Sequence, residues 1–242
     1  MGQAYIRRIA SVITIIMIVL LMSANSGRSD DSRQEGQVMN SKKRVMLIGA
    51  SVGQAWNLLG LPRRQRINEY AFESIAAWQY DKTEALQEVL MRPKRKFHLT
   101  RAYFSGFFQP APQLPNIIII KECAAYFPGD FKEYKQSIQK WTKQIKDAHI
   151  QVILATVVPV TRERSQTRPG QIESILEFND WIREYAKNGN LVLIDLEAQL
   201  RESAAQRFLK KELSTDGLHL NKQAYDLLDK ELLEALRKLE HS

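Results

Sequence analysis

Apolar and polar positions follow one another along most of the chain in a pattern that predicts strands and helices in turn. Short apolar runs of strand length are separated by longer stretches whose apolar residues recur at helical spacing. The predicted strands cover residues 44–50, 72–78, 116–122, 150–159 and 191–196. The predicted helices cover residues 81–91, 131–148, 172–188 and 221–239, with Gly189 as the expected end of the third.

This order of elements predicts a fold class. Strands that alternate with helices form parallel sheets, because each helix returns the chain to the same end of the sheet. We therefore expect an α/β protein in which one parallel five-stranded sheet is covered on both faces, a three-layer α/β/α sandwich. Ligands of such sheets bind outside the carboxyl ends of the strands. Residues that directly follow strands are therefore the first candidates for a functional site.

The first 26 residues have the pattern of an export signal. Arg7 and Arg8 precede an apolar run of fourteen residues at 9–22, and Ala24-Asn25-Ser26 has small residues at both recognition positions for cleavage. The run is shorter than the roughly twenty apolar residues that span a bilayer. We expect a signal peptide, with an uncleaved signal anchor as the alternative. Either form predicts an extracytoplasmic domain, periplasmic or secreted, with membrane contact only through this segment.

The remaining chain predicts a linker and one domain. Residues 27–41 are polar and lack an apolar period, which is typical of a flexible tether. Residues 42–242 suit a single domain with a sizeable core. The net charge of +8 comes from basic residues scattered among acidic ones, so we expect no nucleic-acid partner. The only cysteine, Cys123, excludes an internal disulfide and a cysteine metal cluster.

Three residues with the chemistry of a nucleophilic hydrolase follow predicted strands. Ser51 comes after the first strand, and Asp216 and His219 lie between the last strand and the last helix. A serine hydroxyl is a poor nucleophile until a base takes its proton; an imidazole does this, and a carboxylate orients the imidazole. The ordinary alternatives are that Ser51 and Asp216 cap helices and that His219 is a surface residue.

The sequence around these residues resembles one known family. Gly49-Ala50-Ser51 resembles the nucleophile block of the GDSL-type, or SGNH, hydrolases, and Asp216-Gly217-Leu218-His219 with Leu220-Asn221 resembles the closing block of that family. The resemblance extends from about Arg44 to the C-terminus. It implies a flavodoxin-like sheet, an esterase or lipase-like activity, a Ser51–His219–Asp216 triad, and no cofactor or metal.

The resemblance also implies an oxyanion hole, and here the chain departs from the family pattern. The third block of the family resembles GxND, whereas this chain has Lys121-Glu122-Cys123-Ala124, with Lys121 in place of the Gly and Cys123 in place of the Asn. The second block falls near Tyr80, where no glycine occurs. We treat Tyr80, Lys121, Glu122 and Cys123 as candidate oxyanion or substrate-pocket residues. The alternative for the adjacent charges of Lys121 and Glu122 is an ion pair at the rim of the pocket.

Three classes of function follow. The first is an exported serine esterase that removes an acyl group, such as acetyl, from a glycan or lipid. The second is an acyltransferase that uses the same triad with an acceptor alcohol in place of water. The third is a catalytically degenerate module of the same fold that binds a glycan or a protein, which the altered third block favours. The sequence does not indicate an oligomeric state.

Overall fold

The computed structural model describes residues 42–92, 97–98, 109–110 and 113–241. The predicted signal segment and linker lie outside the described residues, so both stay predictions. No helix within the described ranges is long and apolar enough to cross a membrane.

One parallel sheet forms the centre of the domain. Its strands are β1 (Lys43–Gly49), β2 (Tyr70–Ala76), β5 (Ile117–Lys121), β6 (Gln151–Ala155) and β7 (Val192–Ile194). They lie in the order β2-β1-β5-β6-β7 and every neighbouring pair is parallel. The two-residue strands β3 (Phe97–His98) and β4 (Gln109–Pro110) form a separate antiparallel pair. The expected five-stranded parallel sheet is confirmed.

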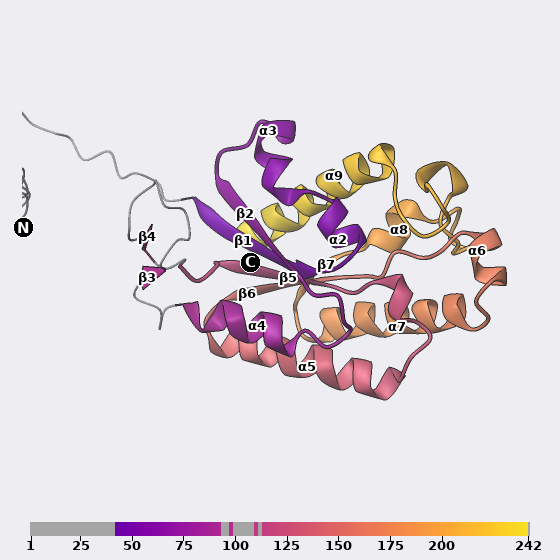
Figure 1. Cartoon of the computed structure of the whole chain (residues 1–242), viewed down its shortest axis with the longest axis horizontal. Coiled ribbons are helices and arrows are strands. Elements are labelled where there is room, and N and C mark those ends of the chain that lie inside the picture. Colours follow the sequence, from indigo (N-terminus) through magenta and orange to yellow (C-terminus); the bar gives the residue numbers. More distant parts are fainter. Residues whose placement is uncertain (1–41, 93–96, 99–108, 111–112, 242) are drawn as a thin grey trace, which may run out of the picture. The chain divides into compact units, whose positions relative to one another are not determined.

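Helices cover both faces of the sheet, which confirms the three layers (Figure 1). One face carries α2 (Val52–Ala55), α3 (Leu61–Gln65), α8 (Leu196–Leu200) and α9 (Lys222–Glu240); the other carries α4 (Thr83–Leu90), α5 (Phe131–Asp147) and α7 (Gln171–Asn188). The short helix α6 (Arg162–Gln166) follows β6, and 3-10 turns lie at η1 (Leu58–Gly60), η3 (Ala124–Tyr126) and η4 (Lys211–Leu213).

The central strand β5 shows why the sheet is buried on both sides. Ile117 and Ile119 belong to the core under α9, whereas Ile118 and Ile120 belong to the core under α5 and α7. Successive side chains of a strand point to opposite faces, so a strand covered on both faces needs an unbroken apolar run. The four isoleucines of the sequence provide it.

Some predicted boundaries are wrong. The second strand covers Tyr70–Ala76 and not residues 72–78, because its seven residues pair with the seven residues of β1. The strand predicted at 150–159 ends at Ala155. Beyond it, the buried Asn179 side chain accepts from the N–H of Val157 and donates to its carbonyl oxygen, which takes those groups away from strand pairing.

Candidate active site

Ser51 lies in the turn between β1 and α2, at the carboxyl end of the sheet. Its backbone has φ 48° and ψ −107°, a conformation that is costly for a residue with a Cβ and that recurs at functional sites. The Oγ is buried and has no hydrogen-bond partner among the described residues. Ser51 precedes α2, but its side chain makes no capping hydrogen bond. The helix-cap interpretation of Ser51 is therefore wrong.

A buried carboxylate on α9 fixes the helical segment that follows Ser51. Asp229 is fully buried and accepts hydrogen bonds from the ring nitrogen of Trp56 (2.8 Å), from the guanidinium of Arg64 (3.0 Å) and from Gln65 (3.2 Å). Because Trp56 directly follows α2 and the other two residues belong to α3, this one side chain joins both helices to α9.

Asp216 and His219 form a hydrogen-bonded pair in the turn before α9. Asp216 Oδ2 lies 2.6 Å from His219 Nδ1, while Asp216 Oδ1 accepts from the backbone N–H groups of Leu218 (3.0 Å) and His219 (2.7 Å). The helix-cap interpretation of Asp216 is wrong, since Asn221 caps α9. With Nδ1 facing the carboxylate, Nε2 is the ring atom left to exchange a proton.

The pKa of Asp216 matches this geometry. Partial burial acts to raise the pKa, but the hydrogen bonds from the backbone and ring of His219 and from the backbone of Leu218 outweigh it and lower the pKa to about 2. The carboxylate is therefore ionised throughout the range in which a histidine titrates.

A glycine lets this turn pack against the loop after β6. Gly217 has φ 84°, and its carbonyl oxygen accepts from the N–H of Thr161 (3.0 Å). A Cβ on Gly217 would lie 2.8 Å from Thr161 Oγ1 and 2.9 Å from Arg164 Cβ, so only glycine fits the contact. Ser214 Oγ accepts a hydrogen bond from the N–H of Gly217 and donates one to the carbonyl oxygen of His219, both at 2.8 Å.

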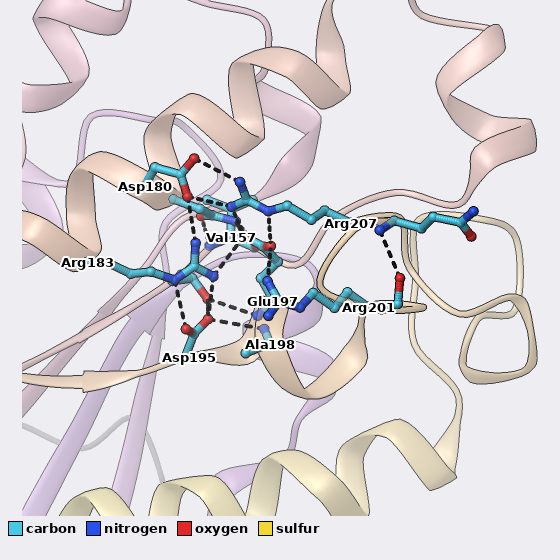
Figure 2. A network of polar contacts seen from close by, with 12 residues as sticks. Val157, Asp180, Arg183, Asp195, Glu197, Ala198, Arg201 and Arg207 are labelled. Carbon is cyan, nitrogen blue, oxygen red and sulfur yellow. Dashed lines mark hydrogen bonds and ion pairs between the residues drawn. The ribbon is translucent and has the colours of Figure 1, made fainter.

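A network of charged residues anchors the chain ahead of the turn (Figure 2). The fully buried carboxylate of Glu197, in α8, contacts the guanidinium groups of Arg183 (2.9 Å), Arg201 (3.2 Å) and Arg207 (2.6 Å). Asn179 donates a further hydrogen bond of 2.9 Å to it. Because α7, α8 and the segment after α8 all contribute, the network fixes the path of the chain toward Asp216.

The structure brings together two of the three predicted triad residues. Asp216 and His219 are in contact, and both side chains are about half exposed, at 52% and 47%. The structure records no hydrogen bond from either of them to Ser51. Catalytic hydrogen bonds are often long before a substrate binds, so this geometry alone does not remove Ser51 from the set. The complete triad stays a prediction.

The predicted oxyanion or pocket residues are packed into the domain. Lys121, Glu122 and Cys123 are all at least 97% buried, and Tyr80 donates its hydroxyl hydrogen bond to the carbonyl oxygen of Tyr134 (2.7 Å). The alternative of a Lys121–Glu122 ion pair is wrong, because the carboxylate of Glu122 pairs with Lys82 at 2.6 Å. The oxyanion role of these residues stays a prediction.

Sequence reasoning missed Lys82. Its Nζ is buried with Glu122 and lies 5.5–5.9 Å from the ring centres of Tyr80, Tyr126 and Trp141. A lysine before a helix gives no sequence signal of burial, and its partner is forty residues away. Only the fold places the two together.

An open hollow of about 520 Å³ borders the Asp216 side of the pair. Its lining is polar and charged: Thr161, Glu163, Arg164, Thr167, Lys211, Ser214, Thr215, Asp216 and Gly217. Among the described residues, no group of three or more His, Cys, Asp or Glu side chains is arranged to hold a metal ion.

Residues 109–227 match the GDSL-like lipase/acylhydrolase family, a stretch that includes Asp216 and His219 but not Ser51. The chain carries a GDSL-like lipase/acylhydrolase domain. By family it is therefore an esterase-type hydrolase. No curated protein sequence matches the chain.

Solved structures share the fold of this GDSL-like domain. A GDSL-like lipase from Bacteroides thetaiotaomicron has a TM-score of 0.59 at 17% identity, over 84% of this chain and 92% of its own. The acetylxylan esterase Axe2 from Geobacillus stearothermophilus has a TM-score of 0.53 at 11% identity, over 80% and 94%. The psychrotrophic esterase EstA from Pseudoalteromonas has a TM-score of 0.53 at 15% identity, over 83% and 100%. At such identities the likeness shows the fold.

Proposed function

We propose that this GDSL-like domain is a serine esterase that hydrolyses an acyl ester, with Ser51 as nucleophile, His219 as base and Asp216 as the residue that orients the base. The observation that carries the proposal is the 2.6 Å contact between Asp216 Oδ2 and His219 Nδ1. That contact fixes the ring tautomer that leaves Nε2 unprotonated, which is the form a general base needs.

The reaction follows from these roles. Ser51 Oγ attacks the ester carbonyl carbon while its proton passes to His219 Nε2, and Asp216 stabilises the imidazolium that forms. The tetrahedral intermediate expels the alcohol, which takes the proton from His219, and an acyl-Ser51 remains. Water then repeats the sequence and releases the acid.

Two features favour a glycan as the carrier of the acyl group. The residues that line the hollow beside Asp216 include hydroxyl, carboxylate and cationic groups, which can hydrogen-bond the hydroxyls of a sugar. In addition, Trp78 follows β2 at the same edge of the sheet as Ser51, and 68% of its surface is exposed. An exposed aromatic ring at this edge offers a flat apolar face to a sugar ring. The fold neighbour Axe2 is an acetylxylan esterase, which agrees with an acetylated glycan as substrate.

Hydrolysis of p-nitrophenyl acetate tests the triad. Members of a triad act as a unit, so we expect Ser51→Ala to lower kcat by at least about 10³-fold, His219→Ala to cost nearly as much, and the double variant to cost little more. Ser174→Ala, in α7, is the matched control and should keep the wild-type rate.

Three other outcomes would contradict or change the proposal. Full activity in Ser51→Ala would refute the role of Ser51 as the nucleophile. An inert wild-type protein would favour the binding module, and faster nitrophenol release with an added acceptor sugar would indicate acyl transfer.

We also propose that the domain is exported. The support is the sequence pattern of Arg7 and Arg8, the apolar run at 9–22 and the small residues Ala24-Asn25-Ser26. N-terminal sequencing of the product from an extracytoplasmic fraction should begin after residue 26 if the signal is cleaved, or at the initial residues if it remains an anchor. A soluble cytosolic product with an intact N-terminus would contradict export.

A further inference from the structure

Lys121 packs against the backbone that carries Ser51. It ends β5 next to Gly49, which ends β1: a Cβ on Gly49 would lie 3.2 Å from the carbonyl oxygen and 3.7 Å from the Cβ of Lys121. A Cβ on Gly53, in α2, would lie 3.7 Å from Lys121 Cδ. Because Ser51 lies midway between these two glycines, the side chain of Lys121 runs along the inner side of the Ser51 turn.

The ammonium of Lys121 has no carboxylate partner among the described residues. The side chain is 99% buried, and the acceptor for its Nζ is the backbone carbonyl oxygen of Glu122, at 2.9 Å. The carboxylate of Glu122 pairs instead with Lys82, which packs among the aromatic rings near α5. An ammonium in the interior is costly unless an anion or hydrogen bonds compensate for the lost water. In its protonated form, Lys121 therefore carries a positive charge that no carboxylate of the described residues pairs with.

Ser51, between the two glycines that contact Lys121, carries a second polar group without a partner. Ser51 Oγ is buried and makes no hydrogen bond among the described residues. In the proposed reaction this oxygen and the carbonyl oxygen of the substrate are the atoms that gain negative charge. A fixed positive charge next to them is stabilising in the transition state because it requires no reorganisation when the charge develops.

We propose that Lys121 is a positioning residue for the proposed esterase: its buried ammonium holds the turn of Ser51 and supplies positive charge toward the oxygens that become negative during acylation. This inference rests on the proposed function and deepens it. The proton of Ser51 still goes to His219 and from there to the leaving alcohol, so Lys121 exchanges no proton. In this arrangement the cation replaces part of the oxyanion stabilisation that a side-chain donor at Cys123 would provide.

Substitution by methionine separates this role from a structural one. Lys121→Met keeps most of the side-chain volume and removes the charge, so we expect labelling by a fluorophosphonate probe to slow by about 10²-fold, the value typical of one oxyanion donor. Replacement of an unpaired buried charge by an apolar group of similar size is often neutral or stabilising. The melting temperature of Lys121→Met should therefore equal or exceed that of the wild type. Lys132→Met, at an exposed position of α5, is the control and should change neither quantity.

The pH dependence of the labelling rate gives a second test, one that a change in packing alone would not affect. Burial lowers the pKa of Lys121, with Lys82 adding to the shift while Cys123 and Glu122 oppose it. In the wild type, the labelling rate should fall as the pH rises and Lys121 loses its proton, at a lower pH than an exposed lysine would. Lys121→Met should lose this fall.

Three outcomes decide the matter. Slow labelling, an unchanged or higher melting temperature, and loss of the fall in labelling rate with rising pH in Lys121→Met would support the inference. Wild-type labelling rates in a folded Lys121→Met, or slow labelling that only follows a lowered melting temperature, would overturn it while leaving the esterase intact. A wild-type protein that the probe does not label at Ser51 would refute the proposed function, and the inference with it.

Discussion

Ser51 combines an unusual backbone conformation with a hydroxyl group that could act as a nucleophile. A positive φ in a residue other than glycine is uncommon, and such strain gathers where the surrounding structure needs a side chain in a particular place. Ser51 has φ 48° although its hydroxyl caps no helix and makes no hydrogen bond among the described residues. The strain is therefore not explained by local stabilisation, which favours a functional reason for this serine.

The contacts between the site residues differ in how well the sequence predicts them. Asp216 and His219 lie three positions apart, so a local turn places them together and the sequence predicts the pair directly. Lys82 and Glu122 lie on different elements and meet only through the fold. The sequence places Lys121 at the end of an apolar strand. It does not predict that the side chain is buried against the Ser51 turn, because charged residues are rarely buried without a partner.

Gly217 offers a test of the Asp216–His219 turn. Gly217→Ala introduces a Cβ at φ 84° within 3 Å of both Thr161 and Arg164, so the turn must shift. We expect a loss of about 1–2 kcal/mol in unfolding free energy from the backbone strain. Esterase kcat should fall by at least about 10²-fold, since a 1 Å misplacement of a catalytic group has effects of that size.

Gly189→Ala, at the end of α7, is the matched control for this prediction. Gly189 has φ −87°, which alanine adopts readily, so kcat should stay close to the wild-type value. Wild-type kcat in Gly217→Ala, measured on a protein with unchanged circular dichroism, would mean that the turn does not position His219.

At the scale of elements, long periodic segments were predictable and short ones were not. Residues 131–148 and 172–188 carry several turns of apolar spacing, and the structure has α5 and α7 there. The four- and five-residue helices α2, α3, α6 and α8 have too few residues to show a period. Packing against the rest of the domain determines them, as Asp229 does for α2 and α3.

The Glu197 network gives a prediction about stability against acid. Burial acts to raise the pKa of Glu197, but the contacts with Arg207, Arg183 and Asn179 outweigh it and lower the pKa to about 2. A lowered folded-state pKa means that the ionised form stabilises the domain above the unfolded-state pKa of about 4.3. This contribution is lost as the pH falls from there toward 2.

Glu197→Gln measures that contribution. Removing one partner of a buried ion pair costs about 3–5 kcal/mol, so urea unfolding at pH 7 should show a loss near the lower end of that range. The difference from the wild type should shrink between pH 4.3 and 2. Asp180→Asn is the control: Asp180 binds two of the same arginines but is 59% exposed, so its loss should cost at most about 1 kcal/mol. Equal effects of the two substitutions would contradict the account of the network.

At the scale of the whole molecule, the topology explains why one edge of the sheet holds the chemistry. All five strands are parallel, so their carboxyl ends lie at the same edge. Lys121 ends β5 there, and the segments after β1, β2 and β6 carry Ser51, Trp78 and Thr161. The turn of Asp216 and His219 reaches this edge through the hydrogen bond from Thr161 to Gly217. The alternation of strands and helices predicted this convergence, whereas the strand order and the side-chain contacts required the structure.

The measurement that most directly tests the esterase account is the site of covalent modification by a fluorophosphonate. A fluorophosphonate reacts covalently with an activated serine hydroxyl, so the labelled residue identifies the nucleophile. Peptide mass spectrometry of the labelled full-length protein should place one adduct on Ser51, and His219→Ala should slow its formation by at least about 10²-fold. An adduct on another residue, or no adduct on a folded protein, would contradict the account.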